Sequence, residues 1–294
     1  MITILKNWIT WGALSILLIV LVYLRLWMAL RRPHREQVTE KDSWVYAQTT
    51  GNKEVQADCA QIYKNNAGTM AVLADGIGKE NTGKIAAQVA ADSILDVFEP
   101  YYVLKNPEYF LQTAFKEAHT KVQITLEGRR GGASTGAVFM DQNYLYYGLA
   151  GNIRIALLRN GELIPLSKGH TMDVLAKAAY EEGRLSRQEA IWSMEESGLW
   201  NYLGMNGFSG IEVSNPAITV KAGDIILMAS KGIYEEVSFA EMEDILIENI
   251  TLREKAECIV MRAEQKGTLE KDNGSVILLT AEVSHGGRDE KSQF

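Results

Sequence analysis

An apolar run stops abruptly on an aspartate and a glycine at residues 72–78, which read Val-Leu-Ala-Asp-Gly-Ile-Gly. This pattern is typical of a buried strand that carries the carboxylate of Asp75 to its end, where Gly76 lets other groups approach the backbone. Residues 81–98 follow with alanines at helical spacing, which predicts a helix packed closely on a sheet. A carboxylate at such a strand end suits a site for a hard metal ion or a phosphate. An ordinary strand–turn–helix unit with a solvated aspartate is the alternative.

The chain between residues 43 and 281 alternates short strands with pairs of helices. Strands are predicted at 43–49, 58–64, 69–75, 134–140, 144–149, 154–159, 162–165, 218–221, 224–229 and 274–281. Helices are predicted at 81–98, 107–125, 170–197 with a break at 182–183, 238–248 and 252–265. This order predicts an α+β fold of two sheets with helices outside each.

The N-terminal region has the composition of a membrane anchor. Residues 8–24 carry no formal charge and are mostly Leu, Ile, Val and aromatic residues. Because the side chain of Arg25 can snorkel, the apolar segment extends to Leu30, which is long enough to cross a bilayer. Three arginines follow within five residues, which predicts a single-pass cell-membrane protein whose C-terminal domain is cytoplasmic. A cleaved signal peptide is the alternative, but its small-residue cleavage site is missing.

These features divide the chain into a transmembrane anchor with a basic collar, a linker, a globular domain and a polar tail, at residues 1–36, 37–42, 43–283 and 284–294. Residues 1–36 hold five of the 30 basic and one of the 37 acidic residues, which leaves 25 basic and 36 acidic residues and a net charge of −11 for the rest. Such an acidic domain is a poor binder of nucleic acid. The collar suits the anionic headgroups of a lipid bilayer.

Four further segments accompany the first one in a fixed order. They are residues 131–138, 144–159 with a Gly-Asn turn, 221–232, and 271–279 with an Asp-Asn pair. In this order the chain resembles the metal-dependent type 2C protein phosphatases (the PPM family) over about residues 45–283. The resemblance implies a four-layer αββα sandwich of two mainly antiparallel sheets flanked by helices. It also implies that water between two Mn or Mg ions attacks phosphoserine or phosphothreonine.

The resemblance assigns roles to single residues. It places metal ligands at Asp58, Asp75, the Gly76 carbonyl and Asp272. Lys53 stands where the family has an arginine that binds the substrate phosphate. A lysine keeps the charge but loses the bidentate geometry of a guanidinium, so we expect looser phosphate binding.

Two positions depart from the family pattern. Asn152 stands where members usually have an aspartate that helps to hold a third metal. Lys231 replaces the aspartate of a Ser-Asp-Gly segment, which ligates a core metal. An ammonium a few ångströms from a divalent ion is repelled by several kcal/mol at an effective dielectric constant of about 20. We therefore expect at most one ion, with Lys231 held by salt bridges between Asp75 and Asp272. The alternative is that Lys231 points into solvent and the metal binds with one ligand fewer.

Three functions are compatible with these residues. The first is a membrane-anchored pseudophosphatase, or a very weak phosphatase, that binds a phosphorylated protein or a component of a Ser/Thr kinase pathway. The second is an active Mn- or Mg-dependent phosphatase that tolerates Lys231 by using a shifted or single metal. The third is a non-catalytic scaffold at the membrane.

Overall fold

The structure, a computed structural model, describes residues 43–79, 81–195, 198–266 and 270–281. The chain separates into two compact units, Met1–Lys41 and Asp42–Phe294, and the described residues all belong to the second. The predicted anchor, collar, linker and polar tail lie outside the described residues. Among the helices that are described, none has both the length and the apolar character needed to cross a membrane.

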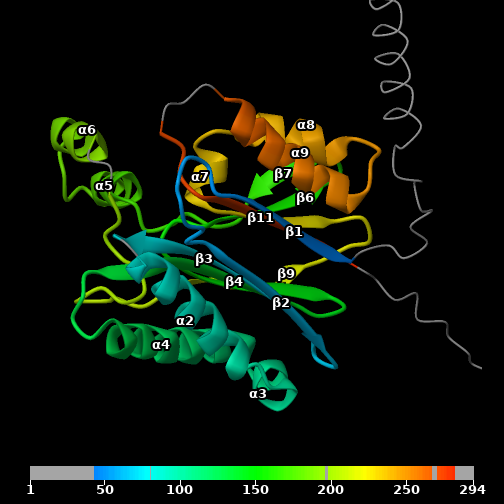
Figure 1. Cartoon of the computed structure of the whole chain (residues 1–294), viewed down its shortest axis with the longest axis horizontal. Coiled ribbons are helices and arrows are strands. Elements are labelled where there is room, and N and C mark those ends of the chain that lie inside the picture. The colour runs from blue at the N-terminus through cyan, green and yellow to red at the C-terminus, as the bar shows by residue number, and fades with distance from the viewer. Residues whose placement is uncertain (1–42, 80, 196–197, 267–269, 282–294) are drawn as a thin grey trace, which may run out of the picture. The chain divides into compact units, whose positions relative to one another are not determined.

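Two antiparallel sheets form the centre of the second unit (Figure 1). The first sheet has the strand order β1 (Trp44–Thr49), β11 (Gly274–Thr280), β10 (Ile225–Ala229), β6 (Arg154–Arg159) and β7 (Glu162–Pro165). The second has the order β2 (Cys59–Asn65), β3 (Gly68–Gly78), β4 (Gly131–Met140), β5 (Tyr144–Ala150) and β8 (Glu212–Val213). A further short strand, β9 (Ile218–Thr219), pairs with β5.

Helices pack on the outer face of each sheet (Figure 1). The second sheet is covered by α2 (Thr82–Asp96) and α4 (Pro107–Leu126), with the short α3 (Pro100–Lys105) between them in the chain. The first sheet is covered by α8 (Phe239–Ile247) and α9 (Leu252–Gln265). Two helices, α5 (Met172–Glu181) and α6 (Arg187–Glu195), pack against each other, and the single turn α7 (Lys231–Tyr234) follows β10.

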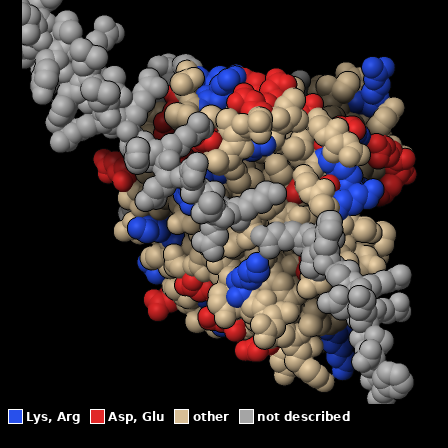
Figure 2. All heavy atoms as spheres, turned by 90° about the vertical axis from the view of Figure 1, so that its right-hand side faces the viewer, with Lys and Arg blue, Asp and Glu red and all other residues tan. Residues whose placement is uncertain are grey.

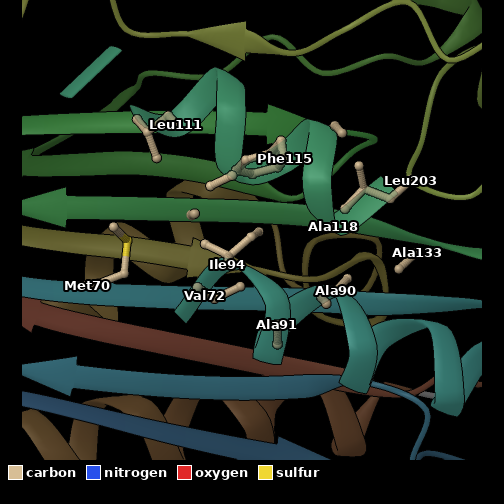
Figure 3. Close-up of a cluster of buried hydrophobic side chains, with 14 of the residues drawn as sticks. Met70, Val72, Ala90, Ala91, Ile94, Leu111, Phe115, Ala118, Ala133 and Leu203 are labelled. Atoms are coloured by element: carbon tan, nitrogen blue, oxygen red, sulfur yellow. The ribbon is translucent and has the colours of Figure 1, made fainter. Parts of the chain in front are cut away.

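Three hydrophobic clusters correspond to the three interfaces of a four-layer sandwich. One lies between α2, α4 and the second sheet, where Ile94 and Phe115 are fully buried and face the strands (Figure 3). A second lies between the two sheets and includes Leu73 and Ile226. The third lies between the first sheet and α8 and α9. The predicted αββα arrangement is therefore confirmed.

Local signals in the sequence account for several element ends. Asn160 and Gly161 have φ of 54° and 83°, the positive values that a two-residue hairpin turn between β6 and β7 requires. Ser238 begins α8 with a capping box, in which its side chain accepts from the Glu241 N–H. The helices α3 and α7 were not predicted, because six and four residues are too short to show helical periodicity.

The ends of several strands meet at one end of the sheets. Gly78, the last residue of β3, pairs with Gly131, the first residue of β4. In the other sheet, the end of β1 at Thr49 pairs with the start of β11 at Gly274. The segments that the family resemblance singled out are therefore brought together here.

Candidate functional site

A cleft of about 1000 Å³ opens at this end of the sheets. Its lining contains six of the seven residues that the sequence assigned to the site, namely Lys53, Asp75, Gly76, Asn152, Lys231 and Asp272. The seventh, Asp58, does not line the cleft and is buried.

Asp58 holds the two sheets together through serine hydroxyls. Its Oδ2 accepts hydrogen bonds from Ser230 Oγ at 2.8 Å and from Ser275 Oγ at 2.6 Å, whereas its buried Oδ1 has no partner. The pKa of this carboxyl is raised to about 6, because burial and the negative charge of Asp272 together outweigh the two hydroxyl hydrogen bonds that lower it. The sequence analysis named neither serine, although each lies in one of the segments that carry the family resemblance, residues 221–232 and 271–279.

Asp75 lies in β3 and interacts with the other two aspartates. Burial raises its pKa well above the usual range, and the negative charges of Asp58 and Asp272 raise it further. A hydrogen bond from the Lys231 backbone and the positive charge of its side chain act in the opposite direction. The structure therefore brings the three carboxylates close enough to influence one another.

Asp272 lies at the rim of the cleft beside Lys53. Lys53 Nζ is 3.9 Å from Asp272 Oδ1, and the Asn273 N–H donates to the same oxygen at 3.0 Å. The Asn273 side chain accepts from the Ala57 N–H at 2.9 Å and donates to the Thr50 carbonyl at 3.0 Å. The late Asp-Asn pair thus fixes the loop that carries Lys53. Because both charged side chains are half exposed, their ion pair adds little to stability.

Lys231 does not form the salt bridges that were expected. Its Nζ lies 3.7 Å from Glu235 Oε2, and no ion pair within 4 Å joins it to Asp75 or Asp272 among the described residues. Its side chain is 43% exposed. The reason is local, because Lys231 is the first residue of α7 and Glu235 lies one helical turn later on the same face. Its backbone N–H, rather than its ammonium, bonds to Asp75.

Asn152 is fixed by a serine of the neighbouring strand. Ser134 Oγ donates a hydrogen bond to the side-chain Oδ1 of Asn152 at 2.8 Å, and it accepts one from the backbone N–H of Asn152 at 2.7 Å. The preceding Gly151 has φ of 112° and donates its N–H to His170 Nδ1 at 3.0 Å. His170 is buried edge-on against Trp200, burial lowers its pKa, and its ring supports the turn at Gly151 through this hydrogen bond.

Oxygen donors for a cation are present near the cleft, but they do not form a cluster of metal-binding side chains. No group of three Asp, Glu, His or Cys side chains in the described part of the chain is arranged to hold a metal ion. Asp58 uses one oxygen for two hydroxyl groups, and one oxygen of Asp272 is shared by Lys53 and a backbone N–H.

Curated bacterial proteins are similar to most of this chain. The Serine/threonine phosphatase stp of Listeria monocytogenes serotype 4b is 27% identical over 225 residues, which cover 74% of this chain and 86% of that protein. The Protein phosphatase PhpP of Streptococcus pneumoniae serotype 2 is 27% identical over 239 residues, which cover 76% and 90%. No family model matches the chain.

Solved structures share the fold. The serine/threonine phosphatase of S. agalactiae matches with a TM-score of 0.70 and 21% identity over 81% of this chain and 99% of its own. The catalytic domain of PstP, solved with two manganese ions, matches with a TM-score of 0.64 and 22% identity over 81% and 96%. In sequence and fold, the chain is similar to bacterial Ser/Thr phosphatases of the PPM type. The described part of the chain has the αββα sandwich and the strand-end cleft of this fold, and it carries Lys231 and Asn152 at that cleft.

Proposed function

We propose that this PPM domain is a pseudophosphatase or a very weak phosphatase. Its cleft would bind a phosphorylated protein or a component of a Ser/Thr kinase pathway. The observation that supports this most is Lys231, which stands where the resemblance places a ligand aspartate. It adds positive charge at the cleft. In addition, no group of three metal-binding side chains is found among the described residues.

The residues present do not fit a centre for two divalent ions. In such a centre two cations together stabilise the attacking and leaving oxygens, and each needs several oxygen ligands. Here one ligand position holds a lysine, and one oxygen of Asp58 already accepts two hydroxyl hydrogen bonds. Asp75, the Gly76 carbonyl, Asp272 and the unpartnered Oδ1 of Asp58 would supply oxygens for at most one Mn or Mg ion. These residues therefore do not support hydrolysis through a pair of metal ions.

Phosphate binding would depend on Lys53 at the mouth of the cleft. Its ammonium is half exposed and lies 3.9 Å from Asp272, so it is available to an incoming anion. A lysine attracts a phosphoryl group as a point charge without the fork geometry of arginine. Loose capture without efficient turnover fits a protein that recognises a phosphorylated partner rather than processes it.

A phosphothreonine peptide tests the proposal. The full chain, purified in mild detergent, is expected to bind the peptide and to release no inorganic phosphate when manganese is added. Binding is measured by fluorescence anisotropy and release by a colorimetric phosphate assay. Manganese-dependent release that disappears in Asp75→Asn would instead identify an active phosphatase. No binding of the peptide would favour the scaffold.

We also propose that residues 8–30 anchor the protein in the cell membrane with the PPM domain in the cytoplasm. The uncharged run at 8–24 and the arginines after it support this orientation. A single cysteine introduced in the domain of a Cys59→Ser, Cys258→Ser chain is expected to resist a membrane-impermeant reagent added to intact cells. Its labelling without cell lysis would reverse the orientation.

Nucleic acid is not proposed as a partner. Beyond residue 36 the chain has a net charge of −11. On the face seen in Figure 2, Lys and Arg side chains are scattered among acidic and uncharged ones and form no broad basic surface.

A further inference from the structure

A second hollow, of about 500 Å³, lies where α4 ends and β4 begins. Two arginines, Arg129 and Arg130, line it, and its lining contains no acidic residue. The main cleft is different, because five acidic and three basic residues line it. In a domain with a large excess of acidic residues, this hollow is a local site of positive charge.

The two arginines have different roles. Arg129 donates from Nε to the Leu126 carbonyl at 3.1 Å and from Nη2 to the Thr125 carbonyl at 3.2 Å, so it caps the C-terminus of α4. Arg130 is exposed and makes no ion pair or hydrogen bond with any residue in the described part of the chain. Its guanidinium is therefore free to bind a carboxylate or phosphoryl group with two parallel hydrogen bonds.

The walls of the hollow are held in place by the rest of the domain. Gly204 donates its N–H to His119 Nδ1 at 3.1 Å, and its φ of 92° suits a glycine. The neighbouring Leu203 exchanges two backbone hydrogen bonds with Ala133, at 2.9 and 3.0 Å. Gln123 of α4 reaches the Met205 carbonyl at 3.4 Å. The hollow is thus formed by packed elements from three parts of the chain.

The hollow lies next to the cleft. Gly131 lines the hollow and pairs directly with Gly78, which lines the cleft. Paired strands are about 5 Å apart, and an extended chain advances about 3.3 Å per residue. A peptide in the cleft could therefore place a side chain in the hollow within a few residues of its phosphorylated position.

We propose that this hollow is an anion-binding subsite in which Arg130 is the main contact. Its ligand is a carboxylate or a second phosphoryl group. We assign this carboxylate or phosphoryl group to the same partner whose phosphorylated residue enters the cleft, and this assignment rests on the proposed function. The partner is then a phosphoprotein. Beside its phosphorylated residue it carries either acidic residues or a second phosphorylated residue.

Four fluorescent peptides test the subsite on the full chain in mild detergent. One has phosphothreonine with neutral flanks, one has phosphothreonine with three glutamates on each side, one has a second phosphothreonine in place of the glutamates, and one has the glutamates without phosphate. Arg130→Gln is expected to weaken binding of the glutamate-flanked phosphopeptide about threefold to tenfold. The neutral-flanked peptide is expected to bind unchanged. Arg187→Gln, which removes the same charge from α6, is the matched control and should alter neither.

The peptides separate the possible outcomes. A greater loss for the doubly phosphorylated peptide than for the glutamate peptide would identify a phosphoryl group as the ligand, and the reverse would identify a carboxylate. Equal binding by the wild type and Arg130→Gln to both charged-flank phosphopeptides, or an equal loss for all peptides, would overturn the subsite. If the neutral phosphopeptide does not bind at all, the proposed function fails. The unphosphorylated glutamate peptide would then decide the subsite, because its binding must still depend on Arg130.

Discussion

Lys231→Asp is expected to bind Mn²⁺ at least tenfold more tightly than the wild-type chain. The substitution reverses the local charge by two units and supplies the carboxylate that the PPM pattern has at this position. At an effective dielectric constant of about 20, one pair of unit charges 4 Å apart interacts by about 4 kcal/mol. A tenfold change requires only about 1.4 kcal/mol, so the expectation allows for screening at a half-exposed position. Isothermal titration calorimetry with MnCl₂ measures the difference.

Glu235→Gln is the matched control for this substitution. It removes the ion-pair partner of Lys231 but adds no ligand to the cleft. It is therefore expected to leave Mn²⁺ affinity the same or lower. Equal affinities for the wild type and Lys231→Asp would show that position 231 does not govern metal binding.

Asp224→Ala is expected to lower the free energy of unfolding by about 1.5–3 kcal/mol, because it removes the carboxylate partner of Arg159 and leaves that guanidinium only its hydrogen bond to the Thr219 carbonyl. Arg159 donates from Nε to Asp224 Oδ1 at 3.1 Å and from Nη2 to Oδ2 at 2.6 Å. Asp224 is only 4% exposed, and its Oδ2 also accepts the Lys221 N–H at 2.7 Å. Urea denaturation measures the loss.

An exposed ion pair offers the comparison. Arg184 and Glu182 are also 2.6 Å apart, but their side chains are 59% and 61% exposed. Glu182→Ala is therefore expected to cost less than about 1 kcal/mol. A loss for Asp224→Ala as small as this would mean that burial does not strengthen the Arg159–Asp224 interaction.

Much of the fold can be predicted because its elements carry repeated local signals. The apolar strand before Asp75, the alanine spacing of α2 and the Ser238 cap each record a local preference that the packing also satisfies. The short elements cannot be predicted in this way. Whether the residues after Ser230 form a helical turn depends on the packing of Gly232 against Asn273, which are far apart in the sequence.

The sequence predicts which residues belong to the site, but it does not predict the direction in which each side chain points or the groups that it contacts. Asp75 and Asp272 could be named from their motifs, and the structure places both at one cleft. The hydroxyl groups that bind Asp58 could not be named in this way, because Ser230 and Ser275 come together only when β10 and β11 pair. The direction of the Lys231 side chain could not be predicted either, since Lys231 begins α7 and its ammonium therefore lies beside Glu235.

The most direct test of the central claim is the number of Mn²⁺ ions that the wild-type chain binds at the cleft. Calorimetric titration of the wild type beside Asp75→Asn, followed by the phosphate-release assay on the same samples, gives both the stoichiometry and the turnover. We expect at most one weakly bound ion that Asp75→Asn abolishes, with little or no release of phosphate. Two tightly bound ions together with robust Mn²⁺-dependent turnover, both lost in Asp75→Asn, would contradict the pseudophosphatase and identify an active PPM enzyme.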